Sequence, residues 1–250
     1  MTRSITLAML LALAAPAPLT ALAAADAGAT HRQTVQFAKG KSSAQVRGSI
    51  KGDRDAEYTL NARAGQMLAV ALKTSNASAY FNIKPPGSKD AAMFIGSSSG
   101  NEAKLLLPAD GSYVVQVYLM RNAARRNESA TYTLDVAVTG QPLAPLPAAQ
   151  DALVPGTRFH ASAAVPCQTL GSEAGASCQA GVIRRGRDGT ATVELRSANG
   201  LVRNVLFVKG QPVASDSAQP VTSSRQGDGV TVRFGGDERY DVPDALLTGG

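Results

Sequence analysis

Apolar side chains recur at every second position in several stretches of the first half of the chain. The clearest stretches are 68–72, 113–119 and 132–138. Alternation with a period of two is typical of β-strands that bury one face. Turn sequences rich in glycine, proline and aspartate separate the stretches, at 51–53, 64–65, 85–87 and 109–111. Short strands at this spacing predict an antiparallel β-sandwich over residues 32–140.

The second half shows a similar pattern. Apolar residues alternate in 191–195 and 230–234, and 205–208 is a short apolar run. We therefore predict an all-β protein in which a second small all-β domain covers residues 157–250. Proline has no backbone donor and favours extended chain. A proline-rich linker is accordingly predicted over residues 141–156, which contain Pro142, Pro145, Pro147 and Pro155.

The first 25 residues have the composition of a secretory signal. Arg3 precedes a short apolar stretch at 5–13, and small residues with Ala-x-Ala spacing follow at 21–25. The apolar stretch is shorter than the roughly 20 residues that a spanning helix needs. These features predict a cleaved signal peptide over residues 1–25, a periplasmic location and no membrane insertion.

Two cysteines, Cys167 and Cys178, lie in the predicted second domain. An even number of cysteines in an exported protein favours a disulfide bond. A metal site is the alternative, but the sequence has no second cysteine pair and no neighbouring histidine to support one.

The positive charge of the chain belongs to its first half. Residues 32–140 contain 14 basic and 8 acidic residues, whereas residues 151–250 contain 10 of each. A basic face could meet nucleic acid, anionic lipid or an acidic protein cleft. Export makes nucleic acid the weakest of these three, and we predict no nucleic-acid partner.

Motifs for catalysis are missing. His31 lies beside the predicted mature N-terminus, where we expect disorder. His160 has no Gly-x-Ser-x-Gly partner, so we interpret it as a surface or strand residue. No zinc, calcium or phosphate-loop motif is present. We therefore predict a protein that binds and does not catalyse, without a cofactor or a metal site.

The stretch 121–127, Arg-Asn-Ala-Ala-Arg-Arg-Asn, concentrates positive charge in a connection of about ten residues between two predicted strands. If it forms one helical turn, Arg121 and Arg125 project from the same side. Arginine donates in a fork that matches a carboxylate, so this loop could enter an acidic cleft. A merely solvated hairpin tip is the alternative.

The first half resembles the periplasmic inhibitors of g-type lysozyme. The matching pieces occur in the same order and cover about residues 33–138. They are 35–52, Tyr58-Thr59-Leu60, Ala64-Gly65-Gln66, 107–113, 121–127 and 132–136.

This resemblance implies a β-sandwich that blocks a glycoside hydrolase, the g-type lysozyme, by occupying its active-site cleft. The inhibitory residues that it implies are Arg121 and Arg125; Asn122, Ser42 and Ser43 match the pattern too, and Arg126 completes the predicted partner-binding set. Residues 75–104 match poorly. The second domain is additional and resembles uncharacterised C-terminal regions of exported bacterial proteins through 239–245.

Two other classes of function stay open at this point. The first is a peptidoglycan- or carbohydrate-binding module, for which Tyr80, Phe81 and Tyr118 are the obvious aromatic candidates. The second is a structural accessory protein of the envelope. The target lysozyme, the role of the second domain and the oligomeric state are not addressed by the sequence.

Overall fold

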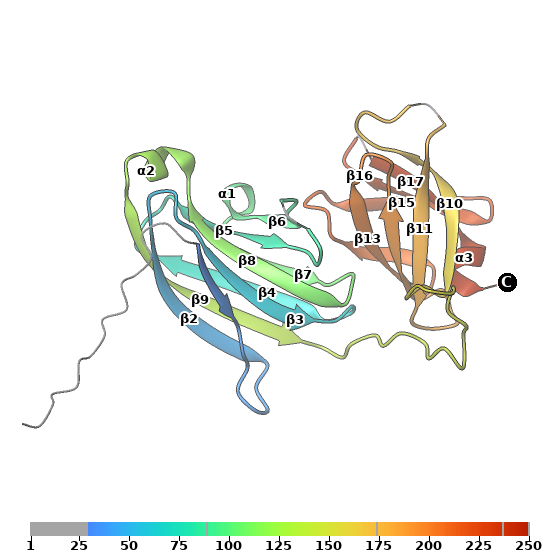
Figure 1. The fold of residues 1–250 in the computed structure, drawn as a ribbon, viewed down its shortest axis with the longest axis horizontal. Coiled ribbons are helices and arrows are strands. Elements are labelled where there is room, and N and C mark those ends of the chain that lie inside the picture. Colours follow the sequence, from blue (N-terminus) through green and yellow to red (C-terminus); the bar gives the residue numbers. More distant parts are fainter. Residues whose placement is uncertain (1–29, 89, 174, 237, 250) are drawn as a thin grey trace, which may run out of the picture.

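The computed structural model describes residues 30–249, except residues 89, 174 and 237, and the predicted signal peptide lies outside the described residues. It contains 17 strands and three short helices, so the all-β prediction is confirmed. Figure 1 shows an N-terminal sandwich built from β1 to β9 and a C-terminal sheet built from β10 to β17. No helix in the described part of the chain is long and apolar enough to cross a membrane.

Two sheets form the N-terminal sandwich. The five-stranded sheet has the order β1-β3-β8-β5-β6 and the four-stranded sheet the order β2-β9-β4-β7. The strands of the first are β1 (His31–Thr34), β3 (Ala56–Ala62), β5 (Ala79–Lys84), β6 (Phe94–Ile95) and β8 (Gly111–Leu119). Those of the second are β2 (Ser43–Lys51), β4 (Met67–Thr74), β7 (Glu102–Leu106) and β9 (Ser129–Thr139). The one-turn helices α1 (Gly96–Ser99) and α2 (Arg121–Arg125) connect β6 to β7 and β8 to β9.

The alternation seen in the sequence places the core between these sheets. On β8, Tyr113, Val115 and Val117 are fully buried, and the residues between them are partly exposed. Leu134 and Val136 of β9 belong to the same hydrophobic cluster. Full burial of an aliphatic or aromatic side chain contributes about 1.5–3 kcal/mol, which makes this shared inner face the main source of stability.

Strand β1 corrects the expectation that His31 lies in a disordered segment. It pairs in parallel with β3, from His31 opposite Ala56 to Thr34 opposite Thr59. The His31 N–H donates to the carbonyl of Asp55 at 3.2 Å, and the imidazole lies edge-on to Tyr58. β1 covers an edge of the five-stranded sheet, and its pairing is the parallel exception in an otherwise antiparallel sheet.

A glycine of β2 makes room for a buried pair of tyrosines. The hydroxyls of Tyr58 and Tyr132 lie 2.6 Å apart and share a hydrogen bond between the two sheets. A Cβ atom on Gly48 would lie 2.5 Å from the Tyr132 hydroxyl oxygen and 2.9 Å from that of Tyr58. Only glycine therefore fits at this position without displacing the pair.

The C-terminal sheet has eight strands in the order β14-β13-β12-β11-β10-β17-β16-β15. Its outer strands β14 and β15 lie side by side, so the sheet curls into a nearly closed barrel. The elements are β10 (Ala161–Gln168), β11 (Ser177–Arg184), β12 (Ala191–Arg196), β13 (Val202–Val208), β14 (Gln211–Ser215), β15 (Val221–Gln226), β16 (Gly229–Phe234), β17 (Glu238–Pro243) and α3 (Asp244–Thr248).

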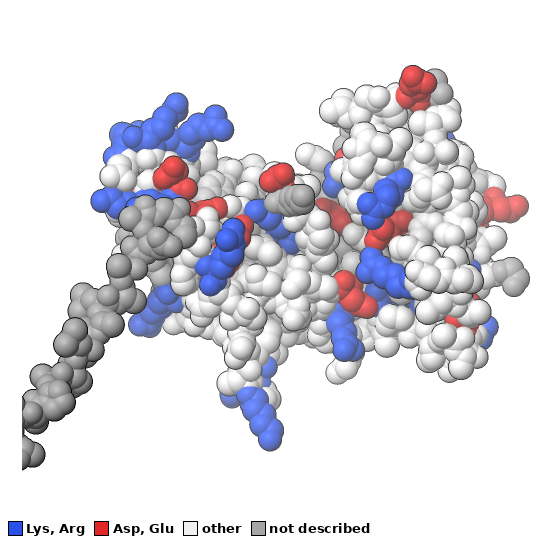
Figure 2. All heavy atoms as spheres, viewed as in Figure 1, with Lys and Arg blue, Asp and Glu red and all other residues white. Residues whose placement is uncertain are grey.

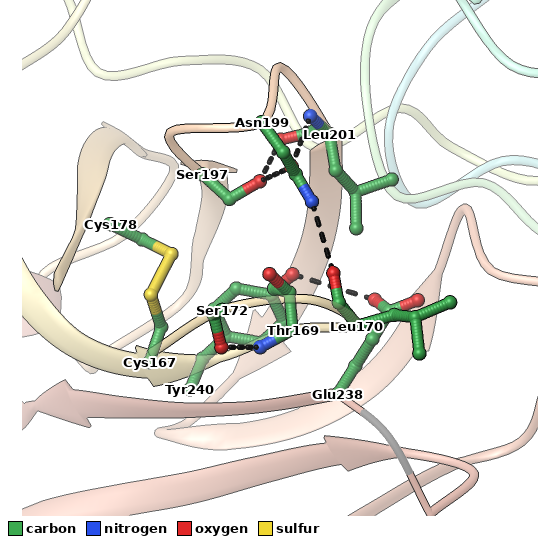
Figure 3. The surroundings of a disulfide bond; sticks show 10 residues. All are labelled: Cys167, Thr169, Leu170, Ser172, Cys178, Ser197, Asn199, Leu201, Glu238 and Tyr240. Carbon is green, nitrogen blue, oxygen red and sulfur yellow. Dashed lines mark hydrogen bonds between the residues drawn. A yellow bond between two sulfur atoms is a disulfide. The ribbon is translucent and has the colours of Figure 1, made fainter. Parts of the chain in front are cut away.

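The predicted disulfide is present between Cys167 of β10 and Cys178 of β11, with the two Cα atoms 5.8 Å apart. It closes the connection between these adjacent antiparallel strands (Figure 3). Within that connection the Ser172 hydroxyl accepts a hydrogen bond from the Thr169 N–H. The amide of Asn199 donates to the carbonyl of Leu170, which links this hairpin to the next one.

The segment between the two halves is held along its length. The Leu143 N–H donates to the carbonyl of Ala64, and the Leu146 N–H donates to that of Arg184. His160 is 7 % exposed and precedes β10, which corrects its interpretation as a surface or strand residue. Its Nδ1 accepts from the Arg184 N–H at 3.0 Å, so Nε2 carries the proton and donates to the Leu146 carbonyl at 3.0 Å.

Arg185 joins the halves from a fully buried position. Its guanidinium donates to Asp110 at 3.2 Å and to the carbonyl of Leu143, and its Nε donates to the Thr192 hydroxyl at 2.9 Å. The Thr192 hydroxyl in turn donates to the carbonyl of Pro108 at 2.7 Å. This contact fixes the C-terminal sheet against the turn that precedes β8.

Replacing Gly48 with alanine is expected to lower the free energy of unfolding by about 2 kcal/mol, because overpacking typically costs 1–3 kcal/mol. Denaturant unfolding checks this result. Ser49→Ala, on the exposed neighbouring position, is the matched control and is expected to change stability by less than about 0.5 kcal/mol. Equal stabilities for the two variants would contradict the steric argument.

A second prediction concerns Asp216, a 2 %-exposed carboxylate beside the junction of the two halves. Oδ2 accepts two hydrogen bonds from Asn204, whereas Oδ1 has no partner among the described residues. Burial raises the pKa of Asp216 to about 6. This pKa is higher in the folded chain than in the unfolded one. Protonation of Asp216 therefore stabilises the folded chain fully below the unfolded pKa, and this stabilisation is lost as the pH rises through 6.

Raising the pH from 4.5 to 7.5 should lower the free energy of unfolding of the wild type by about 2 kcal/mol more than that of Asp216→Asn. The asparagine carbonyl can keep both bonds from Asn204. Urea unfolding at the two pH values measures the difference, with the exposed Asp228→Asn as control. A difference that does not depend on pH would be inconsistent with ionisation of a buried Asp216.

Candidate functional site: the basic tip

The basic stretch forms a compact tip at the end of β8. α2 spans Arg121–Arg125 and is followed by β9 at Ser129. Ala123 is fully buried in the core of the sandwich, which fixes one side of the helical turn. Arg121, Asn122 and Arg125 are exposed. Because Arg121 and Arg125 are four residues apart on one turn, both can project from the same side.

The turn between β2 and β3 packs against the residues that follow α2. The Gly52 N–H donates to the carbonyl of Glu128 at 2.9 Å. Gly52 has a φ of +62°, and a Cβ atom here would lie 2.9 Å from the Asn127 side-chain oxygen. Asn127 itself has a φ of 55°, a conformation that asparagine tolerates better than most residues. These contacts hold α2 in one position relative to the sandwich.

Glu128 connects α2 to a third loop. Its carboxylate accepts a hydrogen bond from the Asn76 amide at 2.9 Å and pairs with the Arg126 guanidinium at 2.6 Å. The Asn76 amide also donates to the carbonyl of Ser129 at 3.2 Å. The hydrogen bond from Asn76, followed by that from Arg126, holds the pKa of Glu128 below its usual range. Arg126 is therefore already paired within the tip.

Charge gathers at this end of the molecule, as Figure 2 shows around α2. Lys51 and Arg54 flank Gly52 in the supporting turn and are exposed. No ion pair within the described residues involves Lys51, Arg54, Arg121 or Arg125. The sequence pattern at 51–53 predicts only a turn. Lys51 lies beside α2 because β2 pairs with β9 and Lys51 stands opposite Ser129. The sequence pattern alone does not give this strand pairing.

Ser42 and Ser43 lie elsewhere. Ser43 pairs with Ala137, and the Val138 N–H donates to the carbonyl of Ser42. Ala137 is eight residues along β9 from Ser129, about 27 Å at the usual rise per residue. The structure therefore brings Arg121, Asn122, Arg125 and Arg126 together and leaves Ser42 and Ser43 at the opposite end of the sheet.

The tip has the chemistry of a binding element. Its exposed guanidinium groups can donate paired hydrogen bonds to carboxylates or phosphates. The Asn122 side-chain oxygen accepts from the Ala123 N–H, and among the described residues no hydrogen bond uses its amide group. Among the described residues there is no group of three histidine, cysteine or acidic side chains placed to hold a metal ion.

The described part of the chain is an all-β protein whose N-terminal sandwich carries an exposed, arginine-rich helical turn. No family model matches the chain. The inhibitor of g-type lysozyme from Escherichia coli (strain K12) is 35% identical over 106 residues, which cover 42% of this chain and 78% of that protein. The chain belongs to the family of g-type lysozyme inhibitors.

Solved structures of the same family are also similar. Aeromonas hydrophila PliG, a periplasmic lysozyme inhibitor of g-type lysozyme, is 35% identical, with 44% of this chain and 97% of that chain covered and a TM-score of 0.40. A mutant of the Escherichia coli PliG is 34% identical, with 44% and 100% covered and a TM-score of 0.36. Salmonella Typhimurium PliG is 30% identical, with the same coverage and a TM-score of 0.35.

Asn76→Ala is expected to raise the pKa of the Glu128 carboxyl toward its usual value, because it removes the larger of the two hydrogen-bond effects. Because folding lowers the pKa of Glu128, its ionised carboxylate stabilises the folded chain above the pKa of the unfolded state. This stabilisation is lost as the pH falls through the pKa of the folded state. NMR titration of the side-chain carboxyl carbon measures the change. Arg126→Ala should also raise this pKa, because it removes both a hydrogen bond and a positive charge, and Asn61→Ala, outside the tip, should leave it unchanged. An unchanged titration in Asn76→Ala would refute the assignment.

Proposed function

We propose that this chain is a periplasmic inhibitor of g-type lysozyme and that it inserts the α2 tip into the acidic active-site cleft of the enzyme. The observation that carries the proposal is the pair of exposed arginines, Arg121 and Arg125, which form no ion pair within the described part of the chain and lie on a helical turn anchored at both ends. Membership of the lysozyme-inhibitor family supports the choice of partner. The proposed role is binding, with no catalytic step of its own.

The chemistry of the partner explains the choice of arginine. Glycoside hydrolases place acidic side chains on either side of the bond that they cleave. A guanidinium that enters such a cleft replaces water with charge-assisted hydrogen bonds, each of which contributes about 1.5–3 kcal/mol when enclosed. The same group in solvent contributes little to folding. The proposed gain therefore arises only on binding.

Anchoring of the tip reduces the cost of binding. A loop that must become ordered loses conformational freedom on association, and a preorganised loop avoids most of this cost. Here Ala123 is buried in the core, Gly52 bonds to the Glu128 carbonyl and Asn76 bonds to the Glu128 carboxylate. In this proposal Arg126 holds the tip in shape, and Arg121 and Arg125 contact the enzyme.

Replacing Arg121 and Arg125 together with alanine is expected to weaken inhibition at least about 100-fold, given the strength of enclosed charged hydrogen bonds. The measurement is the lytic activity of a purified g-type lysozyme titrated with the wild type and the variant. Inhibition by the wild type should weaken as salt screens the attraction.

Lys39→Ala/Lys41→Ala is the matched control. It also removes two exposed charges, but from the segment just before Ser42, whose carbonyl bonds to Val138 at the far end of β9. Ser42→Ala/Ser43→Ala tests whether the enzyme reaches that end as well. Stoichiometric inhibition that the Lys variant keeps and the Arg variant loses supports the proposal. No inhibition by the wild type at micromolar concentration would refute it.

A further inference from the structure

We propose that the lysozyme-binding surface continues from α2 onto the outer face of the five-stranded sheet, where Tyr80, Tyr118 and Met120 form an apolar shelf for the same enzyme. This inference rests on the proposed function and extends it to residues outside the basic loop. The shelf is defined by these three side chains.

The register of two strands places the tyrosines next to each other. Tyr80 of β5 and Tyr118 of β8 are direct partners in the antiparallel ladder. Their neighbours Phe81 and Val117 are fully buried in the core. Because side chains alternate along a strand, Tyr80 and Tyr118 must lie on the outer face, where both are partly exposed. Directly opposed residues have Cβ atoms about 5 Å apart, so the two rings are neighbours.

The shelf is continuous with α2. Met120 follows directly after β8 and precedes Arg121, and its side chain is one of the few large hydrophobic groups that are exposed, at 38 %. The Met120 N–H donates to the carbonyl of Ser78 at 2.9 Å, which ties the end of β8 to the start of β5. Tyr118 is three residues from Arg121, about 10 Å along the chain.

The chemistry of the shelf fits a protein partner that already engages the arginines. Tyrosine and arginine are enriched among the residues that contribute most to binding, and methionine is enriched at interfaces. No hydrogen bond within the described residues uses the hydroxyl of Tyr80 or Tyr118, so both hydroxyls are available to a partner. Apolar side chains beside a charged contact also exclude water from it, which strengthens the charged hydrogen bonds.

The alternative is that the two tyrosines only stabilise the sheet through their cross-strand contact. Inhibition and stability separate these roles. Lytic activity of a purified g-type lysozyme is titrated with the full chain carrying Tyr118→Ala, Tyr80→Ala or both substitutions, and denaturant unfolding confirms that each variant is folded at the assay temperature. Tyr118→Phe, which keeps the ring, is the conservative variant.

We expect Tyr118→Ala to weaken inhibition about 10- to 100-fold, the range of a residue at the centre of an interface. This factor should be the same at low and high salt, whereas the factor for Arg121→Ala should shrink as salt screens it. Val114→Ala is the matched control, because Val114 lies on the same face of β8 four residues away and is expected to change inhibition less than twofold.

Inhibition that survives the loss of both tyrosines, or falls no further than in Val114→Ala, overturns this inference and leaves the role of the arginines intact. A wild type that neither binds nor inhibits the enzyme overturns the proposed function and this inference with it. If Tyr118→Ala does not fold, inhibition by Tyr80→Ala is compared with inhibition by Val114→Ala. Equal inhibition by these two variants then overturns the inference.

Discussion

Burial of alternate side chains along β8 is the constraint on which both ends of the sandwich depend. Tyr113, Val115 and Val117 face the core and are fully buried, so the direction and rotation of this central strand are fixed. Shifting the register by one residue would expose all three. The same alternation turns Tyr118 outward, and α2 begins at Arg121, two residues after β8 ends at Leu119. The position of the tip therefore depends on how β8 packs in the core.

The other end of β8 carries the C-terminal sheet. Asp110 precedes this strand; its carboxylate accepts from the Ala64 N–H at 2.8 Å and from the buried guanidinium of Arg185. Burying a charge costs several kcal/mol unless it is paired and hydrogen-bonded, which explains why Arg185 draws partners from three segments of the chain. Since this junction and α2 lie at opposite ends of β8 (Figure 1), the additional sheet leaves the tip accessible.

Sequence reasoning works well where burial has a period of two. It predicts the all-β class, the strands that contain residues 113–119 and 132–138, and the disulfide between Cys167 and Cys178, each of which the structure confirms. It fails for His31, because a short polar strand that pairs at a sheet edge has no apolar pattern of its own. It also fails for His160, whose ring lies between the Arg184 N–H and the Leu146 carbonyl, partners that no local pattern indicates.

The candidate site is recoverable from the sequence only in part. A run of arginines is visible as charge, and the spacing of Arg121 and Arg125 predicts that they share a side of a helical turn. The pairing of Arg126 with Glu128 involves a second partner, Asn76, which is 52 residues away in the chain. Such non-local contacts need the strand register, which the alternation of side chains alone does not supply. The same limit applies to Tyr80 and Tyr118, which only the pairing of β5 with β8 makes neighbours.

In the proposed function Arg126 shapes the tip and Arg121 and Arg125 contact the enzyme, a division that rests on the pairing of Arg126 with Glu128. Glu128 lies next to α2, and its two oxygens are taken by Arg126 and Asn76. Arg121 and Arg125 form no ion pair among the described residues, and both side chains stay exposed. An exposed pair gains little in water, but a free guanidinium keeps its full capacity for an acidic cleft. An added acid that paired with Arg121 or Arg125 would satisfy these guanidinium groups within the tip and, in the proposed function, would weaken binding to the enzyme.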